Sequence, residues 1–114
     1  MVISVGEKVH VVYRAIFENS SRRHFLGQVT AVEGVLCRLL GYAFVYDPKA
    51  SVFVKRLGQR TTNIDLAESG YIVNVVDSEA DIDKAAYHFV GGTGLVVSDG
   101  GTFSLDINEF GSKS

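Results

Sequence analysis

Residues 35–46 read Val-Leu-Cys-Arg-Leu-Leu-Gly-Tyr-Ala-Phe-Val-Tyr. Apolar residues occupy both alternating sets of positions, and Arg38 is the one charged interruption. A strand that is apolar on both faces is either a central strand covered on both sides or a strand exposed at a subunit contact. Gly41 in its middle predicts a bulge or sharp bend, as found where a sheet curls into a barrel.

The segments around this stretch also have the composition and alternation of strands. They are Lys8–Phe17, His24–Val32, Ser51–Leu57, Thr61–Ile64 and Tyr71–Val76. Tight turns are predicted at Glu33-Gly34 and at residues 47–50, where Asp and Pro occupy the first two positions. Links of this length favour antiparallel pairing, so residues 1–76 are predicted to form a small antiparallel β-barrel.

Residues 77–90 are predicted to form one short helix. Ser78 is placed to cap it, and Glu79 and Asp81 fall in the first turn, where the helix dipole favours negative charge. Four apolar side chains recur at the spacing of one helix face, and they are Ile82, Ala85, Ala86 and Phe89. The fold class is therefore mainly β with one short helix.

Residues 91–110 are predicted to form a glycine connector and a β-hairpin. The connector is Gly91-Gly92-Thr93-Gly94. The hairpin strands are Leu95–Ser98 and Thr102–Ile107, and Asp99-Gly100 between them is a strong turn signal.

Length and composition bound the class of protein. A chain of 114 residues with 46% hydrophobic content fits a single domain, 1–114, with a real core. Cys37 is the one cysteine, so no internal disulfide is possible, and no signal-peptide pattern opens the chain. The longest apolar stretch, Leu39–Tyr46, is far shorter than the ~20 residues of a membrane span. We expect a cytoplasmic protein without a membrane partner.

The charge is divided along the chain. Residues 1–60 carry nine Lys and Arg against four Asp and Glu, a net +5, and residues 61–114 carry two against nine, a net −7. The two halves attract each other, bind separate partners or join neighbouring copies, and the sequence leaves these alternatives open.

No catalytic, metal or cofactor site is predicted. The three histidines, at positions 10, 24 and 88, lack a second ligand at metal spacing. Cys37 lies in the most apolar strand, where a buried thiol stays inert. The acidic run at positions 77, 79, 81 and 83 lacks the central Gly and closing Glu of a calcium loop.

Basic residues give the one candidate binding site. If two strand ends meet, a cationic rim results, and it consists of Arg22, Arg23, Lys55, Arg56 and Arg60. Stacking faces would come from Tyr42, Phe44, Tyr46 and Phe53. Such a rim suits nucleic acid, a nucleotide or another anionic ligand.

Three segments resemble, in order, the opening of the Sm-like and SH3-like small barrels. They are Val9–Tyr13, Phe25–Val29 with Gly27 inside it, and Val35–Tyr46, and the region from Val9 to Tyr46 that contains them is about a third of the chain. The Asp and Asn of the Sm RNA pocket are absent, and Val32-Glu33-Gly34 stands at their place. The resemblance implies a barrel that assembles through strand edges, and it carries over no RNA-binding residues.

The sequence thus favours a non-enzymatic β-barrel that forms homo-oligomers as a binding or assembly module. The predicted interface is the doubly apolar strand, with Leu36, Leu40, Tyr42 and Phe44. The alternative is a nucleic-acid or nucleotide binding module that uses the basic rim.

Overall fold

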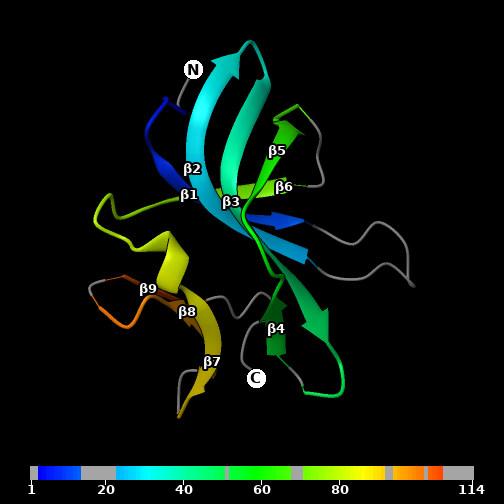
Figure 1. The fold of residues 1–114 in the computed structure, drawn as a ribbon, viewed down its shortest axis with the longest axis vertical. Coiled ribbons are helices and arrows are strands. Elements are labelled where there is room, and N and C mark those ends of the chain that lie inside the picture. The colour runs from blue at the N-terminus through cyan, green and yellow to red at the C-terminus, as the bar shows by residue number, and fades with distance from the viewer. Residues whose placement is uncertain are drawn as a thin grey trace.

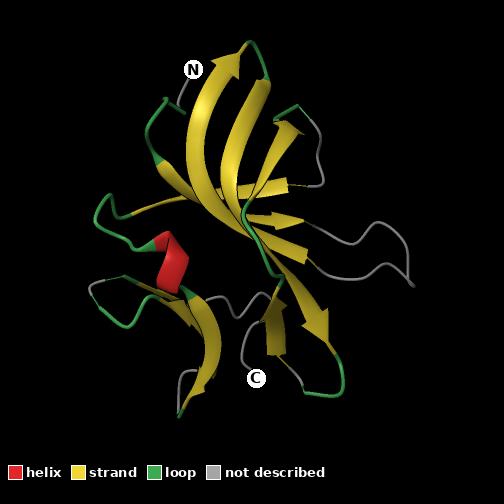
Figure 2. Ribbon diagram, viewed as in Figure 1, coloured by secondary structure: helices red, strands yellow, loops and turns green. Residues whose placement is uncertain are grey.

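The computed structural model describes residues 3–13, 23–50, 52–67, 71–91, 94–101 and 103–106. Within these residues the chain forms nine strands and one short 3-10 helix, and it forms no α-helix. All strand pairs are antiparallel, and they make a six-stranded and a three-stranded sheet (Figures 1 and 2). The predicted mainly-β antiparallel class is confirmed.

The larger sheet contains all the strands predicted between residues 8 and 76. They are β1 (Lys8–Tyr13), β2 (Arg23–Glu33), β3 (Leu36–Asp47), β4 (Val52–Lys55), β5 (Arg60–Asp65) and β6 (Tyr71–Val76). Their order is β4-β3-β2-β1-β6, and β5 also pairs with β3. One edge of the long β3 therefore pairs with two strands, with β5 along its first half and with β4 along its second half.

Two glycines face each other at the centre of this sheet. Gly27 of β2 pairs directly with Gly41 of β3. A Cβ on Gly41 would collide with the carbonyl oxygen of Leu26, and one on Gly27 would lie 2.7 Å from the ring of Phe25. Only residues without a side chain permit this backbone approach. Figure 2 shows that β2 and β3 are strongly curved, so the predicted bend is present, although the register irregularity lies between Val29 and Ala31.

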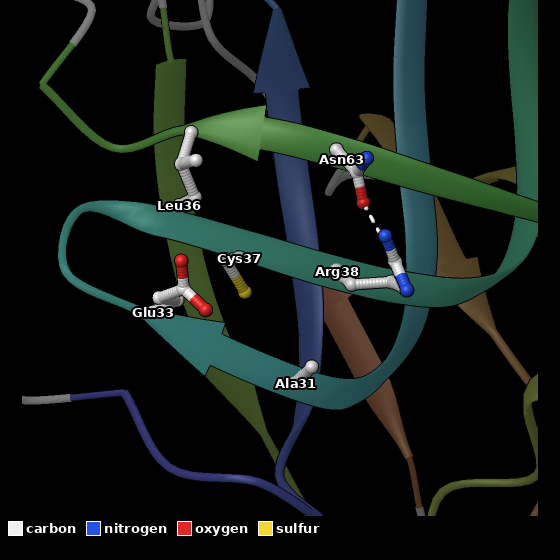
Figure 3. Close-up of a pocket in the computed structure, with 6 residues that line it drawn as sticks. All are labelled: Ala31, Glu33, Leu36, Cys37, Arg38 and Asn63. Atoms are coloured by element: carbon white, nitrogen blue, oxygen red, sulfur yellow. Dashed lines mark hydrogen bonds between the residues drawn. The ribbon is translucent and has the colours of Figure 1, made fainter.

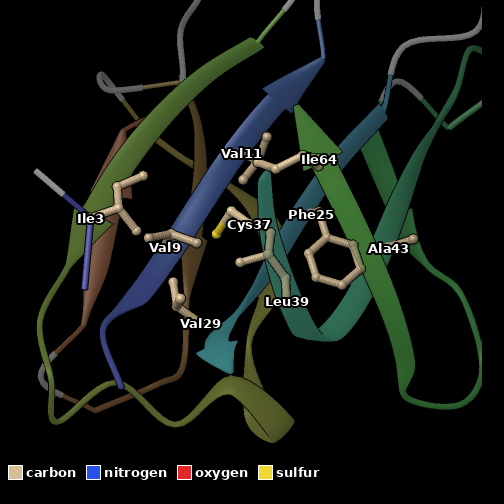
Figure 4. Packing of buried hydrophobic residues seen from close by; sticks show 9 residues of the cluster. All are labelled: Ile3, Val9, Val11, Phe25, Val29, Cys37, Leu39, Ala43 and Ile64. Atoms are coloured by element: carbon tan, nitrogen blue, oxygen red, sulfur yellow. The ribbon is translucent and has the colours of Figure 1, made fainter. Parts of the chain in front are cut away.

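The inner face of the curved sheet carries the first hydrophobic cluster. Its buried members are Ile3, Val9, Val11, Phe25, Val29, Cys37, Leu39, Ala43 and Ile64 (Figure 4). Side chains at alternate positions of β1, β2, β3 and β5 point into it, as the two-residue period of a strand requires. Tyr13, Tyr71 and Val73 pack at its margin.

The outer face of the same sheet carries a second cluster. It is covered by the 3-10 helix η1 (Ile82–Lys84) and by the three-stranded sheet of β7 (Ala86–Val90), β8 (Gly94–Ser98) and β9 (Ser104–Asp106). The buried members of this cluster are Leu26, Phe44, Phe53, Ala80, Ala85, Tyr87, Val97 and Phe103. Burial on both faces explains why residues 42–46 are apolar at every position.

The predicted helix at residues 77–90 is wrong. The side chains of Asp77 and Asp81 accept hydrogen bonds from the backbone N–H groups of Glu79 and Asp83, at 2.8 and 3.1 Å. The first bond closes a turn and the second caps the three-residue η1, so no α-helix begins here. Residues 86–90 then form β7, because their aromatic and β-branched side chains suit a strand and because β8 supplies a pairing partner.

The hairpin predicted around Asp99-Gly100 is confirmed as β8 and β9. The Asp99 carboxylate accepts from the N–H groups of Gly101 and Phe103 in its own turn and from Asp81 before η1. These hydrogen bonds, led by the one from Asp81, lower the pKa of Asp99. One side chain therefore shapes the hairpin and fixes η1 to it.

A closed barrel is not found among the described residues, so that part of the prediction is not supported. Hydrogen bonding ends at β6 on one side and at β4 and β5 on the other. The sheet curls but splits along β3, and β5 is paired away from β6. Of the predicted first strand, positions 14–17 lie outside the described residues.

Replacing Gly41 with alanine should destabilise the fold by at least about 1–3 kcal/mol, since the new methyl group must displace backbone atoms of β2. Gly91→Ala is the matched control, because a Cβ there meets nothing within 4 Å. Urea denaturation of both variants measures the difference. Equal stability of the two variants would contradict the close pairing of β2 with β3.

Candidate functional site

Two histidines and one tyrosine meet between the two sheets, and all three side chains are buried. The hydroxyl oxygen of Tyr87 on β7 lies 2.6 Å from Nε2 of His10 on β1 and 2.7 Å from Nδ1 of His24 on β2. The two imidazole rings lie 5.0 Å apart, edge to face. A phenol can donate to one ring nitrogen and accept from the other, so one hydroxyl joins both strands to the small sheet.

This site favours uncharged histidine. Burial, with a smaller contribution from His24, lowers the pKa of His10 from 6.5 to about 3. Nδ1 of His10 is buried and has no hydrogen-bond partner among the described residues. A proton there would be neither solvated nor shared, which is the physical reason for the low pKa. Stacking on Phe53, with centroids 4.0 Å apart, encloses His24.

This cluster is not among the sites predicted from the sequence. The two histidines lie on the same face of neighbouring strands, and they are diagonal neighbours because His10 pairs with Leu26 and His24 with Val12. Because alternate residues of a strand share one face, the positions of the two histidines in their strands could have suggested the contact. The contact of Tyr87 with the histidines was not predictable, because the sequence predicts a helix at residues 77–90.

Of the five predicted anion-binding residues, the four that the structure describes do not form one rim. Arg22 lies outside the described residues. The Lys55 ammonium donates to the carbonyl oxygen of Asp83 at 2.6 Å and lies 4.2 Å from the ring centroid of Tyr42. Lys55 pairs with Phe44 and therefore points to the outer face of the sheet. Arg56 is exposed beyond the end of β4.

Arg23 and Arg60 do share a neighbourhood, on the inner face. Arg23 pairs with Tyr13, and Tyr13 pairs with Tyr71. Both guanidinium groups act on the Tyr13 hydroxyl and lower its pKa, although burial and Tyr71 outweigh them and raise it overall. The rings of Tyr13 and Tyr71 meet edge to face at 5.1 Å. We call these four residues the inner-face rim.

The aromatic side chains predicted to stack on a ligand are occupied. Phe44 and Phe53 are buried in the second cluster, and Tyr46 contacts Phe53 at 5.3 Å. The Tyr42 hydroxyl donates to the Asp83 carboxylate at 2.7 Å, and this bond raises the pKa of Tyr42. The aromatic rings beside Arg23 and Arg60 are instead those of β1 and β6.

The four residues of the predicted oligomer interface are partly exposed and partly covered. Leu36, Leu40, Tyr42 and Phe44 all lie on the outer face of β3, where the small sheet covers Phe44 completely and Tyr42 in part. Leu36 and Leu40 remain 50% and 38% exposed. Leu36 lines a hollow of about 290 Å³ and Leu40 one of about 220 Å³. The outer face of β3 is thus uncovered only along its first half.

The larger hollow offers little chemistry. Its lining residues are Ala31, Glu33, Leu36, Cys37, Arg38 and Asn63 (Figure 3). Nε of Arg38 donates to Oδ1 of Asn63 at 2.9 Å, which holds the guanidinium against β5. Burial raises the pKa of the Cys37 thiol, which belongs to the first cluster. The hollow therefore supplies no activated nucleophile.

Metal ligands do not gather in the part of the chain that the structure describes, where no three His, Cys, Asp or Glu side chains converge. In the same part, no helix has the length and apolar character of a membrane span. Comparison with known proteins gives no match to a family model, a curated protein or a solved structure.

Acid should destabilise the protein through His10. Its pKa is lower in the folded chain than in the unfolded chain, so the unfolded state takes up the proton first as the pH falls below about 6.5. Stability should fall by about 2 kcal/mol from about pH 7.5 to about pH 5, and further until about pH 3. Urea denaturation across this range measures the slope.

His10→Gln should flatten that slope, and His88→Gln should leave it unchanged because His88 is exposed on β7. Should the His10 variant not fold, an NMR titration of the unmodified protein gives the same information. An imidazole of His10 that titrates near 6.5 would contradict the buried, uncharged site.

Removing the Tyr87 hydroxyl should destabilise the fold by about 1–3 kcal/mol, because Tyr87→Phe leaves buried ring nitrogens of two histidines without this partner. Tyr46→Phe is the comparison, since Tyr46 is only half-buried. Thermal unfolding of both variants tests this. An unchanged melting temperature for Tyr87→Phe would show that the hydroxyl does not join the sheets.

Proposed function

We propose that this chain is a non-enzymatic β protein that associates with a second copy of itself through the outer edge of β6. The observation that carries the proposal is the state of that edge. Within the described residues β6 pairs on one side only, with β1. Its sequence is Tyr-Ile-Val-Asn-Val-Val, in which Ile72 and Val75 are 48% and 54% exposed. An unpaired, apolar strand edge is a template for pairing with another chain.

The other strand edges that the structure describes carry groups that oppose such pairing. Lys55 is the last residue of β4, and Arg60 and Asp65 are the first and last residues of β5. In the small sheet, Asp106 ends β9 and His88 lies in β7. Charged side chains on edge strands are a common protection against pairing. Among these described edges, β6 alone has no Lys, Arg, His, Asp or Glu in its sequence, which favours it as the contact.

A second copy fits β6 because the strand is compatible with itself. An antiparallel pair centred on Asn74 would set Val73 opposite Val75 of the other copy and Ile72 opposite Val76. Each such apolar pair contributes roughly 0.2–1 kcal/mol, and no like charges face each other. A contact of this kind has two-fold symmetry, the commonest arrangement of homo-oligomers. The resemblance to Sm-like and SH3-like proteins, which implies assembly through strand edges, supports the same contact.

Val75→Lys should convert the oligomer to a monomer, since it places a charge on each side of the pairing edge. Light scattering coupled to gel filtration should give twice the 12.4 kDa of one chain for the unmodified protein and 12.4 kDa for the variant. Val35→Lys is the matched control, because Val35 is 47% exposed in the turn between β2 and β3. It should not change the mass.

Three results would overturn the proposal. The first is a monomer at every concentration of the unmodified chain. The second is an oligomer that dissociates with Leu36→Lys or Leu40→Lys but not with Val75→Lys, which would assign the contact to the outer face of β3. The third is an oligomer that dissociates simply on adding salt, which would assign it to the oppositely charged halves of the chain.

A further inference from the structure

The inner-face rim consists of four side chains from four strands of the curved sheet. Three of them, Tyr13, Arg23 and Tyr71, lie at one end of that sheet. Phe25 and Ala43 lie at one end of the first cluster, far from Ile3 (Figure 4). Tyr13 and Arg23 are the next inward-facing positions beyond this end on β1 and β2, because side chains of one face recur every second residue. Arg23 is exposed there and Tyr13 half-buried.

The remaining two members come from β6, which pairs with β1, and from β5, which pairs with β3. Tyr71 pairs with Tyr13 and is the first residue of β6. Arg60 opens β5 opposite Gly41 and shares the inward parity of Ile64, which lies in the first cluster. Both tyrosines pack on the first cluster with part of their surface in solvent. The rim therefore has an apolar floor and a charged margin.

The two guanidinium groups are not neutralised by described carboxylates. Among the described residues, the one ion pair joins Lys84 to Asp81, in and before η1. The charged groups that act on the Tyr13 hydroxyl are Arg23 and Arg60. Placing two cations together without an acid is electrostatically unfavourable in the free protein, and an anion placed between them removes that repulsion.

The geometry points to a binding site for one nucleotide unit, with the phosphate held by Arg23 and Arg60 and the base stacked against Tyr13 and Tyr71. Guanidinium groups bind phosphate through paired hydrogen bonds. Tyrosine faces bind any base by stacking, without reading its sequence. The unit could be a free nucleotide or part of a single strand, and the experiment below separates these sources. This inference is independent of the self-association proposed above.

Fluorescence anisotropy of a labelled oligothymidylate tests the site at low salt. The double variant Arg23→Gln/Arg60→Gln should weaken binding by about tenfold or more, because it removes both phosphate contacts. Tyr71→Leu should weaken binding by about five- to a hundredfold through lost stacking. Lys49→Gln is the matched charge control, in the turn between β3 and β4, and should change little. Thermal unfolding confirms that each variant is folded.

Competition then identifies the source of the nucleotide. Displacement of the oligonucleotide by thymidine monophosphate assigns the site to free nucleotides, and resistance to it assigns the site to a strand. Displacement by inorganic phosphate as readily as by the nucleotide would overturn the proposal, because the tyrosines would then contribute nothing. No binding of oligonucleotide or nucleotide, or an equal loss with Lys49→Gln, would also overturn it. Repeating the titration with Val75→Lys keeps the result separate from self-association.

Discussion

The close pairing of Gly27 with Gly41 determines how the larger sheet curves. Neither position has room for a Cβ, since Leu26, Gly27 and Leu40 backbone atoms lie in the way. The missing side chains let β2 and β3 curve together across the centre of the sheet. The inner face then encloses one hydrophobic cluster, while the outer face presents Leu26 and Phe44 to a second. One sheet thereby serves two cores, which accounts for the doubly apolar sequence of β3.

The second core is held by polar contacts as well as by burial. Lys8 donates to the carbonyl oxygens of Ser78 and Ala80, and Lys55 donates to that of Asp83. At these two lysines the basic part of the chain meets the acidic part through backbone carbonyl oxygens. The carboxylates of Asp77 and Asp81 accept hydrogen bonds within their own turns.

Local alternation was sufficient to predict most of the larger sheet. The period of two in residues 8–76 predicted its strands, and Asp-Gly predicted the last hairpin, because these signals depend on neighbouring residues alone. The prediction of a helix at residues 77–90 was wrong because the same apolar spacing is compatible with a turn followed by a strand. Only the pairing of β7 with β8 decides between a helix and a strand. The prediction of a closed barrel was not supported for a related reason, because the sequence of β5 does not show which strand it pairs with.

The candidate sites were predictable only in part. Arg23 and Arg60 were named from charge, but their separation from Lys55 needed the face of each strand, which strand register decides. Tyr13 and Tyr71 join them through pairing between strands nearly sixty residues apart in the sequence. His10, His24 and Tyr87 likewise come from three strands and two sheets. Contacts between distant segments are what a single sequence conceals.

The placement of the Tyr87 hydroxyl also imposes an order on folding. Its two nitrogen partners belong to β1 and β2, so its binding position does not exist until these strands have paired. Long-range contacts form late because the loops that they close carry a large entropic cost. We therefore expect β1 and β2 to pair first, and the carboxy-terminal third of the chain to acquire its native position after them.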